Sequence, residues 1–265
     1  MYQTDPPLPP KETLPTMYDL PSEDPEEPGG SDEFHNLQPQ LLRETFQPPT
    51  RAEEIFIGTD LNLYYDVHHP LWYKRPDWFA VVGISRLYEA QDLRLSYVIW
   101  QEGVSPLVVV ELLSPGTEKE DLGQTLREVN QPPTKWEVYE RILRIPYYVV
   151  FNRYTDQLRV FVLQGERYQE LNLEGEQFWI PSVELGLGLW SGTYDGINRQ
   201  WLRWFDGSGN WMPTLAEQRE QEREKVKQEK QRVEQEQERA NQEKQRADRL
   251  AEKLRELGID PDTLS

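Results

Sequence analysis

The run from Leu107 to Leu113, with the sequence LVVVELL, constrains the fold of this chain more than any other segment. Six of its seven residues are apolar. A run of this kind is typical of a central β-strand that is covered on both faces. The exception is Glu111, whose carboxylate is costly to bury unless another group compensates its charge. The run therefore predicts a covered sheet with an acidic group inside it.

Further strands and one helix are predicted around this run. The predicted strands are short stretches of apolar, β-branched and aromatic residues broken by turn-forming residues. A helix is predicted over 134–143, directly after the buried strand, and a shorter one over 39–46. This order indicates an α/β (α+β) fold with a mixed sheet flanked by helices. The predicted strands span 61–67, 78–82, 93–100, 107–113, 146–152, 158–163 and 167–173, and a Gly- and Trp-rich segment over 185–204 closes the domain.

Composition divides the chain into four parts. The first is rich in Pro, Asp and Glu, so little apolar area offsets the entropy cost of ordering it, and we expect it to be disordered or extended. The second holds all nine tryptophans and is expected to form the folded domain. The third is predicted to be one long charged helix. The four parts are 1–34, 35–212, 213–258 and the C-terminal end 259–265.

The predicted C-terminal helix starts with a capping-box pattern, Thr214 followed by Glu217, and is expected to stop at Gly258. It repeats with a seven-residue period. One position of the repeat is apolar, but the second position that a stable coiled coil needs is largely Glu. Two alternatives stay open: a solvated single helix with charge pairs along its surface, or a weak coiled coil. The apolar position is Val226, Val233, Ala240, Ala247 and Leu254.

The net charge of −18 is unfavourable for a nucleic-acid-binding protein, because Lys and Arg make the contacts with phosphate. The acidity is concentrated at the N-terminal end, since residues 1–60 hold 13 acidic and 3 basic side chains. Residues 214–256 hold 12 of each. The central region could therefore still carry a local basic face.

Other residue types exclude several kinds of site. The chain has no cysteine, which excludes disulfides, zinc–thiolate sites and a Cys nucleophile. It has three histidines, and the adjacent pair His68 and His69 lacks the spacing of a helical zinc pair. No segment approaches the roughly 18 apolar residues that cross a bilayer, and no signal-peptide pattern is seen at the start. We expect a cytoplasmic protein.

Two carboxylates are the best candidates for chemistry. Asp77 directly precedes the apolar stretch WFAVV, and Glu111 lies within the most apolar strand. Carboxylates at the ends of neighbouring strands can converge on one divalent cation, and Mg²⁺ is typically held by one or two carboxylates together with water and phosphate oxygens. Each acid also has a structural interpretation, as a turn residue for Asp77 and as an ion-pair partner for Glu111.

The order of motifs resembles the Uma family of restriction endonucleases, in the PD-(D/E)XK nuclease superfamily. The motifs are Pro-Asp before a strand, then VVELLSP, an acidic loop, Lys-x-x-x-Tyr on a helix, and PYYVV. The resemblance covers about residues 35–190, and 106–151 is its most specific part. It implies a restriction-endonuclease-like fold and metal-dependent hydrolysis of DNA.

Carried over by position, the resemblance implies that Asp77 and Glu111 bind the metal, Mg²⁺ or Mn²⁺, with the Leu112 carbonyl as a further ligand. The superfamily's usual lysine position is Leu113 here. The family places its lysine on the following helix, four residues before a tyrosine. Lys135 matches that lysine and would stabilise charge on the phosphate.

Three further residues lie near these motifs. Tyr139, which follows Lys135 by four residues, is interpreted as a core residue rather than a catalytic one. Asp121 matches the family's acidic residue after the SP motif, but LGQTLREVNQPPT separates it from Lys135 like an insertion. The family's N-terminal Glu-containing stretch is not recognisable, although His35 matches a histidine that follows it. A lone histidine is more often structural.

Two functional hypotheses follow. The first is a metal-dependent endonuclease that uses Asp77, Glu111 and Lys135. The second is a catalytically inactive nuclease fold that works as an interaction module, forming a homo-oligomer or binding a protein partner through residues 214–257. The altered segment before Lys135 and the long charged helix favour the second hypothesis.

Overall fold

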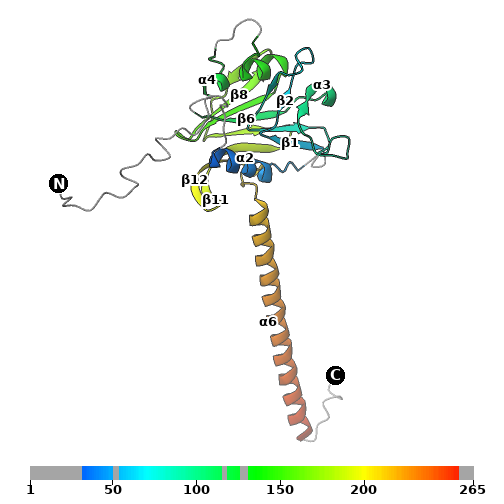
Figure 1. The fold of residues 1–265 in the computed structure, drawn as a ribbon. Helices are drawn as coiled ribbons and strands as arrows, with labels where there is room; N and C mark the ends of the chain where they lie inside the picture. Colours follow the sequence, from blue (N-terminus) through cyan, green and yellow to red (C-terminus); the bar gives the residue numbers. More distant parts are fainter. Residues whose placement is uncertain (1–31, 50–53, 115–117, 126–130, 257–265) are drawn as a thin grey trace, which may run out of the picture. The chain divides into compact units, whose positions relative to one another are not determined.

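The structure is a computed structural model that describes residues 32–49, 54–114, 118–125 and 131–256. The chain divides into two compact units, which meet in sequence between Met212 and Pro213. The first unit contains the sheets, and the second contains one long helix (Figure 1). The disorder predicted for residues 1–34 lies outside the described residues, except at the last three positions.

The largest sheet has six strands in the order β1-β4-β6-β7-β8-β9. All neighbouring pairs are antiparallel except β6 and β7, which are parallel. The mixed sheet confirms the predicted α+β class and is consistent with a restriction-endonuclease-like fold. Its strands are β1 (Ile55–Thr59), β4 (Trp78–Val82), β6 (Val108–Leu112), β7 (Tyr147–Asn152), β8 (Gln157–Gln164) and β9 (Arg167–Glu170).

Strand β6 lies inside this sheet, and all five of its residues are buried. Its side chains alternate between two apolar layers. Val108, Val110 and Leu112 belong to one core cluster, whereas Val109 belongs to the other. Glu111 is the buried exception that the sequence predicted, with an exposed fraction of 0%.

Helix α2 (Glu33–Thr45) and a second sheet of β10, β11 and β12 pack on the face of Val110 and Leu112 (Figure 1). Gln38 connects helix α2 to the second sheet, because its side chain both donates to the Leu202 carbonyl and accepts from the Leu202 amide, each at 2.9 Å. The three strands are β10 (Gln177–Ile180), β11 (Leu185–Tyr194) and β12 (Ile197–Phe205).

Helix α2 begins six residues before the predicted start at residue 39. Asp32 is its N-cap, and the Asp32 carboxylate accepts a hydrogen bond from the His35 amide at 3.0 Å. Pro39 lies inside the helix. The predicted start of the helix was wrong because its capping residue, Asp32, lies in an acidic, Pro-rich segment that was expected to be disordered or extended.

The opposite face of the large sheet is covered by the connection from β6 to β7 and by a small sheet of β2, β3 and β5. Parallel strands need such a crossover, which runs here through helical segments. The helix predicted over 134–143 is confirmed, but it consists of two parts and its second half is a π-helix. The elements are β2 (Leu63–Tyr64), β3 (Tyr73–Lys74), β5 (Tyr97–Val98), α4 (Glu118–Asp121), α5 (Lys135–Glu137) and η1 (Val138–Ile142).

The strand predicted over 93–100 is largely wrong. Only Tyr97 and Val98 form a strand, and a short helix α3 (Ile99–Glu102) follows directly. Leu93 and Leu95, which suggested the strand, are 66% and 94% exposed. Arg94 holds this loop by hydrogen bonds to side-chain and backbone oxygens, so its conformation comes from polar contacts rather than from an apolar face.

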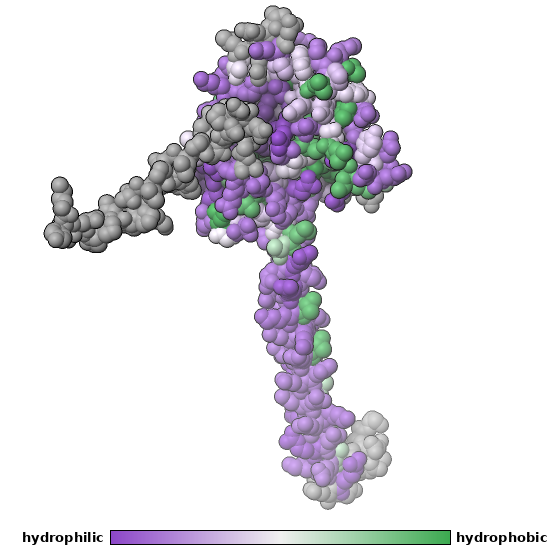
Figure 2. Space-filling view, viewed as in Figure 1, coloured by the Kyte–Doolittle hydropathy of each residue, from purple (hydrophilic) through white to green (hydrophobic). Residues whose placement is uncertain are grey.

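The second unit is helix α6 (Leu215–Glu256), with 42 residues and a length of about 63 Å. Its predicted capping box is confirmed, because the Thr214 amide donates to Glu217 Oε2 at 2.7 Å and the Glu217 amide donates to Thr214 Oγ1 at 3.2 Å. Figure 2 shows a hydrophilic surface with a few separate apolar side chains along it. No helix in the described part of the chain is long and apolar enough to cross a membrane.

Candidate active site

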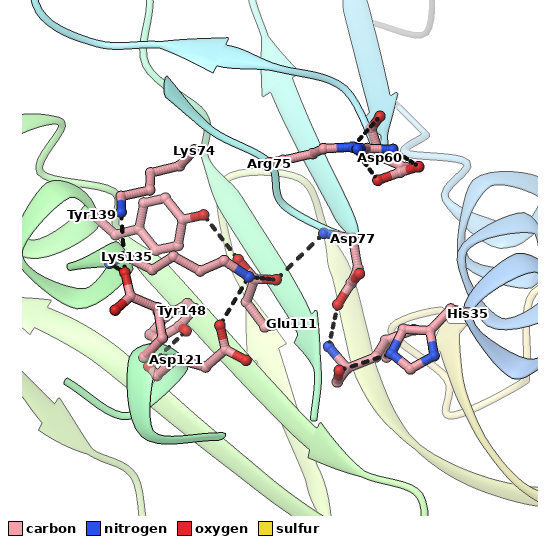
Figure 3. Close-up of polar contacts among 12 residues, drawn as sticks. His35, Asp60, Lys74, Arg75, Asp77, Glu111, Asp121, Lys135, Tyr139 and Tyr148 are labelled. Atoms are coloured by element: carbon pink, nitrogen blue, oxygen red, sulfur yellow. Dashed lines mark hydrogen bonds and ion pairs between the residues drawn. The ribbon is translucent and has the colours of Figure 1, made fainter. Parts of the chain in front are cut away.

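The register of β4 and β6 brings the two predicted acids together. Trp78 pairs with Val110 in an antiparallel ladder, so the preceding residue, Asp77, lies opposite Glu111. The Asp77 amide donates to Glu111 Oε2 at 3.4 Å, and the Leu112 amide donates to Asp77 Oδ2 at 2.6 Å (Figure 3). Asp77, Glu111 and Leu112 therefore form one polar group at the end of β6.

Lys135 reaches the same group from the first turn of α5. Thr134 caps this turn and forms a capping box with Glu137, which fixes where the helix begins. The Lys135 Nζ atom lies 2.9 Å from Glu111 Oε2 and 2.8 Å from Asp121 Oδ1. The apparent insertion thus separates Asp121 from Lys135 in sequence but not in space.

Tyr139 follows Lys135 by four residues, a spacing that places two side chains on one side of a helix. It is a buried core residue, as the sequence indicated, with an exposed fraction of 0%. It is also part of the polar group, because its hydroxyl donates to Glu111 Oε1 at 2.8 Å. Both oxygens of the Glu111 carboxylate are therefore held by one helical segment.

The charges in this cluster do not balance. Asp77, Glu111 and Asp121 surround Lys135, so three carboxylates share one amine. Burial raises the pKa of Glu111 to about 8, and the carboxylates of Asp121 and Asp77 act in the same direction against the opposing effect of Lys135. Burial also raises the pKa of Asp77. Although burial disfavours its charge, Lys135 has a pKa well above the usual value because of the surrounding carboxylates.

A second polar chain reaches the site from the α2 side, and sequence reasoning missed it. Arg153 contacts Asp32 at 2.6 Å, and Asp32 contacts His35 Nδ1 at 2.9 Å. His35 Nε2 lies 3.0 Å from the Leu112 carbonyl oxygen. Burial alone would lower the pKa of His35, but the hydrogen bond with Asp32, the charge of Asp77 and the Leu112 carbonyl raise it to about 9. His35 therefore donates to both partners.

The donor set fits a divalent cation bound by oxygen atoms. In the described residues, no three His, Cys, Asp or Glu side chains are grouped as metal ligands. Two carboxylates and the Leu112 carbonyl are present, and Mg²⁺ usually takes few protein ligands and fills its other positions with water and phosphate oxygens. The Leu112 oxygen has two lone pairs, so it can accept from His35 and still face a cation. A cation would relieve the repulsion among these carboxylates, which together with burial raises the pKa of Glu111.

Residues 8–195 match the family model of Uma2, which is described as "Putative restriction endonuclease". The match spans more than half of the chain. The chain belongs to this family. No curated protein matches it.

All residues of the cluster lie within the part that matches Uma2, whereas β12 and α6 lie outside it. The resemblance drawn from the sequence motifs is thus confirmed at the level of the family. Of the predicted residues, Asp77 contacts Glu111 and Leu112, and Lys135 contacts Glu111. Their catalytic roles remain predictions. The sequence did contain a signal for the polar contacts of Arg153, Asp32 and His35, since Asp32 stands three residues before His35 in a helix-capping position.

Proposed function

We propose that this protein is a divalent-cation-dependent endonuclease that hydrolyses phosphodiester bonds in DNA. The observation that carries the proposal is the contact of Lys135 with Glu111 and Asp121 beside Asp77, at the end of a buried strand. A buried cluster with excess negative charge is expensive unless it binds a cation. The family supports a nuclease-like activity.

In this proposal, Asp77, Glu111 and the Leu112 carbonyl hold Mg²⁺ or Mn²⁺. Bound there, the cation would activate a water molecule and neutralise charge on the scissile phosphate. The protein holds the ligands of the cation in position. Tyr139 and Lys135 fix the Glu111 carboxylate, the Leu112 amide fixes Asp77, and His35 fixes the Leu112 carbonyl.

Lys135 has a second role in the proposal. Its amine stays charged at physiological pH, because the carboxylates around it raise its pKa. A fixed positive charge beside the cation stabilises the additional negative charge that develops on the phosphate in the transition state. Asp121 contacts the same amine at 2.8 Å and thereby restrains its position.

The test is nicking of supercoiled plasmid DNA by the purified protein with Mg²⁺ and with EDTA. We expect Mg²⁺-dependent nicking by the wild type and a loss of at least about 100-fold in Asp77→Asn and in Glu111→Gln. Asp156→Asn and Glu170→Gln are matched controls, because they make the same chemical changes at exposed positions. Equal nicking by all five proteins, or no nicking by the wild type with Mg²⁺ or with Mn²⁺ in its place, would reject the proposal.

The second candidate function is an interaction module built on residues 214–257, forming a homo-oligomer or binding a protein partner. Val226, Val233 and Leu250 favour it, since they are 60%, 41% and 54% exposed on α6. Sedimentation of the full chain and of Val226→Lys/Val233→Lys tests self-association. A wild type that sediments as a monomer at every concentration would exclude the homo-oligomer.

The cytoplasmic location remains a prediction.

A further inference from the structure

A pocket of about 430 Å³ opens at the free edge of β1, which is an outer strand of the six-stranded sheet. Three parts of the chain line it. The last turn of α2 contributes Arg43, and the loop after β4 contributes Arg86, Leu93 and Arg94. The rest of the described lining comes from β1 and Leu61, and no described lining residue is acidic.

Among the described residues, two of the three arginines have no acidic partner. The Arg94 guanidinium is neutralised by Glu102, with contacts of 2.6 and 3.0 Å to its two carboxylate oxygens. Within the described parts of the chain, neither Arg43 nor Arg86 forms an ion pair with a carboxylate. Burial lowers the pKa of Arg43, and the positive charge of Arg86 lowers it further, so the two guanidiniums are close enough to repel each other.

Arg43 is also held in place. Its Nη2 atom donates to the Ile57 carbonyl at 2.9 Å and to Thr59 Oγ1 at 3.4 Å. These contacts use one end of the guanidinium, and its Nε and Nη1 donors bind no other described residue. A fixed guanidinium with free donors binds a phosphate or carboxylate well, because its planar fork matches two oxygen atoms.

The pocket lies close to the proposed catalytic cluster. Thr59, in the pocket lining, pairs with Trp78, the residue after Asp77. The amide of Asp60 also donates to the Asp77 carbonyl at 3.2 Å. Neighbouring strands are about 4.8 Å apart, so the pocket begins one strand away from Asp77.

We propose that Arg43 and Arg86 bind a backbone phosphate of the DNA strand that is cut at Asp77 and Glu111. This inference rests on the proposed function and identifies where a chain with a net charge of −18 contacts nucleic acid. The apolar residues Ile57 and Leu93 in the same pocket suit the sugar beside that phosphate. The excess of acidic groups elsewhere makes a local positive site necessary, since phosphate contacts supply most non-specific affinity.

The test is binding of a short fluorescein-labelled DNA duplex, measured by fluorescence anisotropy in EDTA at several salt concentrations. EDTA prevents cleavage, so binding is measured without the proposed chemistry. At about 0.1 M salt, we expect the double variant Arg43→Gln/Arg86→Gln to bind DNA more weakly than the wild type. The expected loss is about tenfold for each phosphate that the variant no longer neutralises. The slope of log affinity against log salt should fall by about 0.9 for each such phosphate.

Arg141→Gln/Arg159→Gln is the matched control, because it removes the same charge from arginines that are paired with Glu140 and Glu170. It should keep the wild-type salt slope. Thermal melting of both double variants shows whether they are folded. If loss of Arg43 and Arg86 changes neither affinity nor slope, or if both double variants change equally, the inference is overturned. Unchanged DNA binding would leave the edge of β1 as a surface for a peptide strand.

The outcome is separable from that of the nicking assay. If Glu111→Gln nicks DNA like the wild type but the Arg43 and Arg86 variant binds weakly, the catalytic proposal fails and the phosphate site stands. If nicking requires Glu111 but the variant binds DNA normally, the phosphate site fails alone.

Discussion

Charged side chains of the same kinds occur in two very different settings in this protein. Around Lys135, Glu111 and Asp121 are buried and Asp77 is partly buried, and the contacts of the amine are 2.8 and 2.9 Å long. Along α6, acids and bases alternate at the surface, and pairs such as Arg223–Glu220 and Lys227–Glu224 have separations of 3.7 and 3.5 Å. The buried set is unbalanced, whereas the helix carries equal numbers of both signs.

The difference shows which charges bear on function. Exposed pairs are screened by water and contribute little free energy each, so α6 tolerates changes in any one of them. A buried, unbalanced cluster is costly, and it persists because a proton or a cation relieves its charge. The free energy of unfolding should therefore respond strongly to changes in the cluster and weakly to changes on α6.

The largest effect is expected for Lys135→Met. This change leaves the buried carboxylates of Glu111 and Asp121 without their amine, and the free energy of unfolding should fall by about 3–5 kcal/mol. Urea denaturation in EDTA, followed by tryptophan fluorescence, measures it. Lys227→Met on α6 is the control and should change the value by less than about 0.5 kcal/mol.

The cause of that loss can be checked with Glu111→Gln. If buried negative charge is responsible, Lys135→Met/Glu111→Gln should be more stable than the sum of the single changes indicates. Strict additivity would mean that Lys135 contributes mainly through the packing of its side chain.

Tyr139→Phe should have the next largest effect. It removes the hydroxyl that donates to the buried Glu111 carboxylate, and the expected cost is about 1–3 kcal/mol. Tyr73→Phe, at a position that is 46% exposed, is the matched control and should be nearly neutral. Equal stability of Tyr139→Phe and the wild type would show that this hydrogen bond is unimportant for folding.

The Asp32 contact gives a pH-dependent prediction. Partial burial raises the pKa of Asp32, but His35 and Arg153 outweigh that effect and lower it to about 2. A lowered acid pKa stabilises the fold above the ordinary value of 3.8, and this contribution is lost as the pH falls through 2. Asp32→Asn should therefore cost about 1–2 kcal/mol at neutral pH, after allowance for solvent screening, and less as the pH falls toward 2. A cost that is independent of pH would contradict it.

The smallest effect is expected for Arg232→Gln. Arg232 contacts Glu229 at 2.7 Å, which is the shortest ion pair described on α6, but both side chains are more than half exposed. Thermal melting should show a change below about 0.5 kcal/mol. A larger loss would mean that α6 is held by its charge pairs more strongly than exposure suggests.

Local sequence patterns were enough to find the centre of the site. The apolar runs after Asp77 and around Glu111 identified β4 and β6, because buried strands need such runs. Lys135 was identified through the resemblance to the Uma family, whose lysine lies four residues before a tyrosine, and the side chains of Lys135 and Tyr139 both reach Glu111.

The remaining contacts depend on chain paths that no local pattern encodes. Asp121 meets Lys135 only because the segment between them folds back on itself. His35 contacts a carbonyl 77 positions away. Arg43 and Arg86 line one pocket at the edge of β1, a strand that was not predicted. The strand expected around Leu93 does not form, because hydrogen bonds of Arg94 hold this segment as a loop.

The Asp77 and Glu111 carboxylates are proposed to bind a divalent cation. Isothermal titration calorimetry with Mn²⁺ tests it directly, without DNA. The wild type and the surface control Glu170→Gln should bind one ion with equal affinity, and Glu111→Gln should bind at least about tenfold more weakly. Equal Mn²⁺ affinity in Glu111→Gln and the wild type, or no binding by the wild type, would show that these carboxylates do not form the proposed cation site.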